Sequence, residues 1–481
     1  MMTGRSRMQA VVLMALFCLM GSALPAQACC MQGQLPPPVR QALKQEAVPQ
    51  DAVSIYVRQL GADSAAVSHH AGRSLNPASA MKLVTTYAAL ELLGPAYRWR
   101  TEIYREGEMA DGVLAGNLLI KGYGNPELMQ QDIWRMLNEL RQTGLREIRG
   151  DLLIDNSYFA PESVDPGLFD NEPYRAYNAQ SSALVSNLNS TSFKFSGDGA
   201  AVRVQTSPEL PEIRVVNQLT LSDAACNDWR GGLVYEVQNA GNQATVTFTG
   251  SYPMSCGEKY LDLSLFSHPA YTYFLFRQIW QQLGGSISGG FRLAQVSPAA
   301  VRLVEHQSEP LADVIRRINK YSNNLMTRQL LLTIAADRVG LPGNEMNGFA
   351  AIRSWLAGKG MHFPELVIEN GAGLSRMERI SAEHLGELLG QAYSSPVMPE
   401  LMSSLPVLAV DGTAVRRLTD SPVQGRAHLK TGSLNGVRSI AGYVLDQQGR
   451  RWVVVFMTNH EQAGATRPAQ DALLDWVYHR R

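Results

Sequence analysis

Three short motifs that occur in a fixed order constrain the fold of this chain more than any other feature. They are Ser79-Ala80-Met81-Lys82, Ser322-Asn323-Asn324 and Lys430-Thr431-Gly432. Each motif alone recurs by chance in chains of this length, whereas the ordered trio supplies a hydroxyl nucleophile, a base and a proton relay in one set. Ser79 and Ser322 are 243 residues apart. If the motifs meet in one site, the chain between them must form additional domains.

The first motif lies at a predicted helix start. Residues 83–93 are apolar, which predicts a buried helix with Ser79 in its first turn and Lys82 on the same face. A serine hydroxyl is a weak nucleophile, and a lysine can act as its base only when burial or a second cation lowers the lysine pKa. Lys82 lies under the apolar helix, and Lys430 would be the second cation. The helix N-terminus favours negative charge at Ser79.

The other two motifs are expected at a helix break and on a strand. Residues 311–318 and 325–336 have helical periodicity, so Ser322 and Asn324 fall between two helices. The third motif precedes residues 440–458, which read as a β-hairpin. The ordinary alternatives are a helix cap, an interhelical turn and an exposed edge lysine, and each would be favoured for its motif alone. The ordered trio favours catalysis instead.

The residues around these motifs extend the pattern. The relevant stretches are Asn76–Thr86, Lys320–Met326, Gly371–Arg376, Leu405–Val407 and Asp411–Thr413. Together they resemble the D-alanyl-D-alanine carboxypeptidase/endopeptidase family, the class C low-molecular-mass penicillin-binding proteins. The resemblance runs from about residue 45 to the C-terminus and is weakest between about 160 and 300.

This resemblance implies an α/β (α+β) fold. The expected catalytic domain is of the serine penicillin-recognising transpeptidase type, with helices packed on an antiparallel sheet, and a β-rich insert of two subdomains interrupts it. The expected segments are a signal peptide at 1–28, catalytic segments at 29–95 and 264–481, and inserted domains at 96–263. The implied activity is a D-alanyl-D-alanine carboxypeptidase and endopeptidase that cleaves peptidoglycan stem peptides and cross-links and is acylated by penicillins.

The resemblance also implies roles for the motif residues. Ser79 would be the nucleophile and Lys82 its base, Ser322 would relay the proton to the leaving amine, and Asn324 would hold the substrate peptide group. Charge and hydroxyl hydrogen bonds would bind the terminal carboxylate, while glycine lets the substrate backbone approach. These contacts would come from Lys430, Thr431, Gly432 and Ser433, and the backbone N–H groups of Ser79 and Ser433 would form the oxyanion hole.

Two further residues match the family outside the trio. Asp155 corresponds to an insert residue near the amine of the substrate side chain, and Arg376 to an arginine that faces the carboxylate of the same group. The alternatives are a turn aspartate at a strand end and a surface ion pair.

Two alternative functions remain open at this point. A β-lactamase would need fast deacylation, which class A enzymes achieve with a glutamate-positioned water, and no counterpart is evident here. A non-catalytic wall-binding scaffold could keep the fold, although the intact trio argues against it. Positive and negative residues balance at 43 each, which gives no electrostatic case for a nucleic-acid partner.

The N-terminus reads as a secretory signal. Arg5 and Arg7 precede an apolar run over 11–20, and Ala26-Gln27-Ala28 is a cleavage site, so we expect a periplasmic protein with no transmembrane helix in the mature chain. Lipid attachment at Cys29 is a less favoured alternative. The proline-rich stretch 32–39 is expected to be a mobile leader.

The cysteine pattern agrees with export. Cys226 and Cys256 are the only cysteines beyond the mature N-terminus, and an oxidising compartment favours a disulfide between them over two free thiols. The histidines show no metal-binding spacing, and no phosphate-binding loop is present, so we expect neither a metal nor a cofactor. The sequence does not indicate an oligomeric state.

Overall fold

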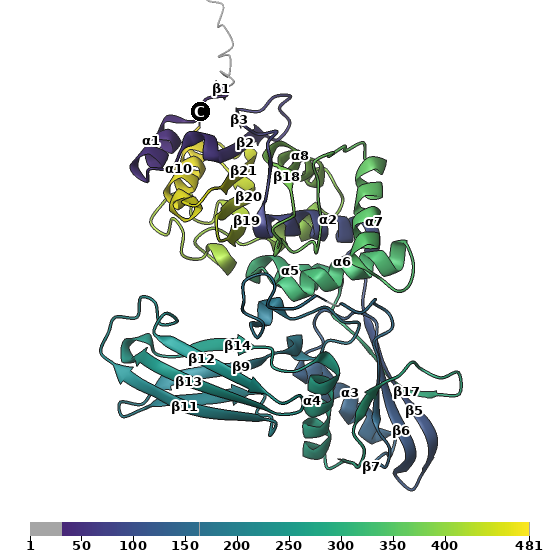
Figure 1. The fold of residues 1–481 in the computed structure, drawn as a ribbon. Helices are drawn as coiled ribbons and strands as arrows, with labels where there is room; N and C mark the ends of the chain where they lie inside the picture. Colours follow the sequence, from purple (N-terminus) through teal and green to yellow (C-terminus); the bar gives the residue numbers. More distant parts are fainter. Residues whose placement is uncertain (1–30, 163, 481) are drawn as a thin grey trace, which may run out of the picture.

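A six-stranded sheet forms the centre of the catalytic domain in the computed structural model, which describes residues 31–162 and 164–480 (Figure 1). The strand order is β1-β3-β2-β21-β20-β19, and all neighbouring strands are antiparallel except β1 and β3. The strands are β1 (Met31–Gln32), β2 (Val53–Gln59), β3 (Val67–His69), β19 (Ala427–Leu434), β20 (Val437–Leu445) and β21 (Arg451–Asn459). Both ends of the described chain therefore contribute strands to one sheet, as the α/β prediction requires.

The hairpin predicted at the C-terminal end is present. Strands β20 and β21 pair from Val437–Asn459 to Leu445–Arg451. The carboxylate of Asp446 closes the turn by accepting the backbone N–H groups of Gln448 and Arg450. Residues 452–458 of β21 are buried throughout because helices cover both faces of the sheet.

One face of the sheet is covered by helices from the two chain ends. These are α1 (Pro37–Gln45) and α10 (Arg467–Tyr478), which pack side by side (Figure 1). The expectation of a mobile leader at 32–39 is wrong, because Pro37 begins a helix whose Val39 and Leu43 are fully buried. Proline is favoured in the first turn of a helix, where its missing N–H has no partner to lose.

The opposite face carries the helices that hold the first two motifs. Helix α8 (Ala382–Tyr393) packs directly on the sheet, and α2 (Lys82–Leu93) lies beside it. Behind them are α5 (Leu311–Tyr321), α6 (Asn324–Arg338), α7 (Glu345–Gly358) and α9 (Met398–Ser404). Helix α2 is apolar on all sides and buried along most of its length, as its sequence predicts. The short strands β4 (Ser74–Leu75) and β18 (Ile380–Ser381) pair beside it.

The insert has two parts, and the first is a mixed sheet with two helices. The sheet contains β5 (Arg100–Ala110), β6 (Val113–Gly122), β7 (Glu147–Ile148), β8 (Leu152–Asp155), β15 (Ser286–Ile287), β16 (Phe291–Leu293) and β17 (Val301–Gln307). The helices are α3 (Gln130–Gln142) and α4 (His268–Gln282), and both contribute buried side chains to the insert core.

The second part of the insert is a sandwich of two three-stranded sheets. One sheet contains β9 (Thr191–Gly197), β10 (Val202–Ser207) and β14 (Lys259–Leu263), and the other β11 (Ile213–Ser222), β12 (Leu233–Asn239) and β13 (Ala244–Pro253). Phe193 and Phe195 from one sheet meet Phe248 of the other edge to face. Cys226 and Cys256 form the predicted disulfide beside this core.

The chain returns to the catalytic domain later than residue 263. Strand β17 pairs with β5 over Val301–Gln307, and α5 begins at Leu311 in the catalytic core. The expected boundary at 263–264 lies within the chain segment that forms the insert, and we propose that the catalytic domain resumes at residue 308. The mixed sheet of the insert thus takes strands β5 to β8 from the chain before the β sandwich and strands β15 to β17 from the chain after it.

The N-terminal predictions lie outside the described residues. These are the signal peptide at 1–28 and the lipidation alternative at Cys29. Within residues 31–162 and 164–480, no helix combines the length and apolar character needed to cross a bilayer.

Candidate active site

The predicted nucleophile lies in a tight turn that other segments hold in place. Ser79 belongs to the 3-10 helix Ala78–Met81, which leads directly into α2. Ala78 has a left-handed φ of 46°, and Asn76 accepts its N–H at 2.8 Å. Asn76 also exchanges two hydrogen bonds with Asn459 at the end of β21, at 2.8 and 2.9 Å. The sheet therefore fixes the backbone that presents Ser79.

Lys82 connects the first two motifs. Its Nζ lies 3.2 Å from Ser79 Oγ and 2.7 Å from Asn324 Oδ1, and it also donates to the carbonyl oxygen of Ala372. The side chain is fully buried. The structure thus brings the predicted nucleophile, its predicted base and the predicted amide-binding residue into direct contact.

Ser322 and Lys430 form a second contact pair. Ser322 follows the last residue of α5 with a left-handed φ of 58°, and Asn323 caps α6 by accepting the N–H of Met326. This break between helices, predicted from the periodicity, turns Ser322 toward the strand β19. Lys430 Nζ donates to Ser322 Oγ at 2.9 Å and to the Thr431 carbonyl at 2.8 Å.

Burial shifts both lysines toward the neutral amine. Burial lowers the pKa of Lys82 well below its usual value, and the nearby positive charge of Lys430 lowers it further. Glu378 opposes this shift in the pKa of Lys82. Burial also lowers the pKa of Lys430, to about 7. The prediction that burial and a second cation depress the Lys82 pKa therefore agrees with the geometry.

The turn at residues 369–373 packs against Lys82, and Glu378, which holds this turn, was not predicted from the sequence. Buried Glu378 accepts the backbone N–H groups of residues 369, 370 and 371 on one carboxylate oxygen, at 3.2, 3.0 and 2.7 Å. The turn carries the Ala372 carbonyl that Lys82 contacts. Gly373 follows with φ 78°, and a Cβ built on it would lie only 2.0 Å from the Ala78 carbonyl oxygen.

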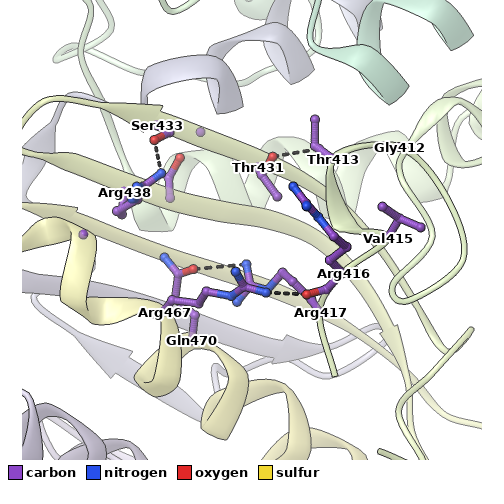
Figure 2. A pocket seen from close by; sticks show the side chains of 13 residues that line it. Gly412, Thr413, Val415, Arg416, Arg417, Thr431, Ser433, Arg438, Arg467 and Gln470 are labelled. Atoms are coloured by element: carbon purple, nitrogen blue, oxygen red, sulfur yellow. Dashed lines mark hydrogen bonds between the residues drawn. The ribbon is translucent and has the colours of Figure 1, made fainter. Parts of the chain in front are cut away.

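The third motif lies on β19, the edge strand of the sheet. Gly432 packs against the nucleophile turn, because a Cβ built on it would lie 2.6 Å from the Pro77 carbonyl oxygen and 3.0 Å from Ser79 N. Ser439 of β20 donates to the same carbonyl at 2.6 Å. The side chain of Ser433 lies on the other face of the strand, where it accepts from Arg438 (Figure 2). Gly432 is therefore where the edge strand meets Ser79.

A comparison with protein families identifies the chain. The sequence model of the D-Ala-D-Ala carboxypeptidase 3 (S13) family matches residues 37–479. The chain belongs to this family. It is accordingly a serine-type D-Ala-D-Ala carboxypeptidase, a hydrolase, and the resemblance inferred from the motifs is confirmed.

Relatives of the S13 chain carry the same activity in their names. A D-alanyl-D-alanine carboxypeptidase of Actinomadura sp. (strain R39) is 30% identical over 425 residues, which cover 84% of this chain and 77% of the relative. The D-alanyl-D-alanine carboxypeptidase DacB of Haemophilus influenzae is 26% identical over 394 residues, which cover 80% of this chain and 81% of the relative.

A solved structure shares the fold of this S13 enzyme. The crystal structure of penicillin binding protein 4 (dacB) from Haemophilus influenzae superimposes with a TM-score of 0.77 at 23% identity, covering 92% of this chain and 99% of the other. The same protein complexed with a β-lactam gives a TM-score of 0.73 at 22% identity. The predicted catalytic fold is confirmed.

The two residues that matched the family outside the trio lie in different settings. Arg376 donates to the carbonyl of Asn435 at 2.8 Å, just beyond the end of β19, and stacks over Phe169 of the insert. Asp155 is buried in the insert, where it lies 3.3 Å from Lys121 and accepts hydrogen bonds from Ser157 and Val296. Arg376 thus adjoins the third motif, while the contacts of Asp155 lie within the insert.

Proposed function

We propose that this S13 enzyme removes the C-terminal D-alanine of peptidoglycan stem peptides through an acyl-enzyme on Ser79. The observation that carries the proposal is the buried Lys82, which joins Ser79 to Asn324, with Lys430 paired to Ser322 beside it. A lysine with a depressed pKa can take the serine proton near neutral pH, which an exposed lysine cannot do.

Acylation then follows from the contacts of each group. Neutral Lys82 accepts the proton of Ser79 Oγ as this oxygen attacks the carbonyl carbon of the penultimate D-alanine. The backbone N–H groups of Ser79 and Ser433 would stabilise the resulting oxyanion, and the close packing of Gly432, the residue before Ser433, against Ser79 supports this role. The C–N bond breaks as Lys82 passes this proton through the hydroxyl of Ser322, which Lys430 contacts, to the leaving amine, so that Lys82 is neutral again.

Deacylation completes the cycle. A water molecule attacks the acyl carbon with Lys82 again accepting a proton, and the shortened peptide leaves as Ser79 regains its hydrogen.

Asn324 holds the peptide group of the substrate, and charged Lys430 with the hydroxyls of Thr431 and Ser433 binds its terminal carboxylate. Arg376, at the end of β19, and Asp155 remain proposed contacts of the substrate side chain.

We also propose that the enzyme acts in the periplasm, cleaves cross-links as an endopeptidase and is acylated by penicillins. The signal-like N-terminus and the Cys226–Cys256 disulfide support the compartment. The β-lactam bound to the structurally similar Haemophilus influenzae protein supports the third point. The two alternatives considered from the sequence, a β-lactamase and a non-catalytic wall-binding scaffold, predict different outcomes in one assay.

Labelling with a fluorescent penicillin separates these possibilities. We expect the wild-type protein to form a long-lived covalent adduct that maps to Ser79, and to release D-alanine from a D-Ala-D-Ala peptide. Ser79→Ala should lose both reactions, whereas Ser403→Ala, which changes an exposed serine on α9, should keep both. A short-lived adduct with fast penicillin turnover would indicate a β-lactamase, and no adduct with no hydrolysis would indicate a scaffold.

A further inference from the structure

A cavity lies beside the edge strand on the face that carries α10. Its volume is about 300 Å³, and it opens next to the third motif. Figure 2 shows Arg438 on one side of Thr431 and Arg416 on the other. The side chains that line it include Thr431, Ser433, Arg416, Arg417, Arg438 and Arg467.

Positive charge exceeds negative charge in this cavity. Asp471 is shared by two of the arginines: buried Arg417 donates to it through Nε at 2.9 Å, and Arg467 Nε lies 3.9 Å from its other oxygen. Arg416 and Arg438 are exposed, and neither forms an ion pair with a carboxylate in the described part of the chain. Two guanidinium groups are thus available for an anion from solution.

The arginines are close enough to affect each other. Burial lowers the pKa of Arg417, Asp471 opposes that shift, and the neighbouring Arg467 and Arg438 add to it. Like charges that face one cavity repel one another in the free protein, and an anion bound between them would relieve this repulsion. The arrangement therefore favours a bound anion over an empty cavity.

The cavity shares the edge strand β19 with the Lys430–Ser322 pair. Strand β19 alternates its side chains, so Lys430 reaches Ser322 on one face while Thr431 and Ser433 reach the cavity on the other. Arg438 pairs with Ser433 across the β19–β20 ladder and donates to its hydroxyl. Gly432 lies between these residues, against the backbone of Ser79. A substrate along this edge can place its leaving group in the cavity.

We propose that Arg438 and Arg416 form an anion subsite for a second carboxylate of the leaving peptide, in addition to the carboxylate that Lys430 binds. The proposal rests on the proposed function, because it names the leaving-group class of the same site. D-Alanine carries one carboxylate, and the cavity offers space and charge for another. A leaving group with two carboxylates, such as the anionic peptide released from a cross-link, is therefore the preferred class of substrate.

The test compares leaving groups that differ in one charge. The substrates share one acyl segment, diacetyl-Lys-D-Ala, and end in D-Glu, in its neutral isostere D-Gln, or in D-Ala. We expect wild-type kcat/KM to be about tenfold higher for D-Glu than for D-Gln, mainly through KM, because a charge-assisted hydrogen bond is worth about that ratio. The ratio should fall as ionic strength rises, since this charge lies at the surface.

Variants assign the effect to the cavity. In the double variant Arg416→Gln with Arg438→Gln, the ratio of kcat/KM for D-Glu to kcat/KM for D-Gln should fall close to one. A change in kcat/KM that is equal for both substrates does not alter this ratio. Arg214→Gln, an exposed arginine of β11 in the insert, should keep the wild-type ratio. A wild-type ratio near one, or a ratio that the double variant leaves unchanged, would overturn the subsite. If wild-type protein hydrolysed none of the three peptides and formed no penicillin adduct, the proposed function itself would be wrong.

Discussion

Gly373 allows the backbone below the nucleophile to pack more closely than any other residue would permit. Its φ is 78°, and an added Cβ would lie 2.0 Å from the Ala78 carbonyl oxygen, 2.2 Å from the Ala78 carbonyl carbon and 2.6 Å from Ser79 N. All three atoms are backbone, so they cannot rotate away. Gly373→Ala must therefore push the Ala78–Ser79 segment aside, by about 1 Å if ordinary contact distances are restored.

A matched control separates this collision from the cost of the backbone conformation. Gly360, after the end of α7, has φ 73°, but a Cβ there would meet no atom within 4 Å. Both alanine variants lose about 1–2 kcal/mol because of the left-handed conformation. Gly373→Ala adds about 1–3 kcal/mol from overpacking, and a displacement of about 1 Å at the nucleophile can cost about 100-fold in rate.

The assay measures stability and activity on the same two proteins. Chemical denaturation gives the free energy of unfolding, and release of D-alanine from a D-Ala-D-Ala peptide gives kcat/KM under conditions where both variants are folded. We expect kcat/KM to fall about 100-fold for Gly373→Ala and to stay within about twofold of wild type for Gly360→Ala. If the folded Gly373→Ala protein keeps wild-type kcat/KM, the claim that this packing positions Ser79 is incorrect.

Changes at Lys430, at Glu378 and at the disulfide test three other parts of the structure. Because burial lowers the pKa of Lys430 to about 7, this lysine loses its charge as the pH rises through that value, and wild-type kcat/KM should decline on the alkaline side. Lys430→Arg should lower the maximum kcat/KM but abolish this decline, and Lys430→Ala should lose more activity; unchanged pH profiles in both variants would contradict the assignment. Glu378→Ala should lower kcat/KM at least about tenfold, because the turn below Lys82 loses its hydrogen-bond acceptor, whereas Glu378→Gln keeps an acceptor oxygen and should lose less. Wild-type kinetics in both variants would show that Glu378 does not position Lys82. Reduction of the Cys226–Cys256 disulfide, which closes a loop of 30 residues, should destabilise the insert by about 3–4 kcal/mol and lower its melting temperature, with a smaller effect on turnover of a dipeptide. If turnover were lost first, the insert and the catalytic domain would be coupled.

The sequence predicted the parts of the site that are encoded locally. Ser79 and Lys82 meet because a serine and a lysine three residues apart at a helix start share a face, and Ser322 follows from the interruption in helical periodicity. The hairpin and the disulfide were predictable for the same reason, since a turn and a pair of cysteines are visible without knowledge of the fold.

The residues that sequence reasoning missed depend on partners far away in the chain. Asn76 holds the nucleophile turn through Asn459, and Arg438 faces arginines that precede it on one loop and follow it on α10. Glu378 looks like an ordinary charged residue until its burial under the turn is known. No local pattern of hydrophobicity or spacing distinguishes these side chains, because only the tertiary fold decides which neighbours they meet.

The pairing of β2 with β21 has a consequence for how the protein is made. Val53 pairs with Thr458, so the central strands of the catalytic sheet come from opposite ends of the chain. The loop between them must close before their contacts contribute any stability, which slows formation of the sheet. The β sandwich of the insert is continuous from residue 191 to 263 and has no such requirement. During synthesis the insert can therefore fold first. Ser79, near the N-terminal end, reaches its final position only after β21 has been made and has paired with β2.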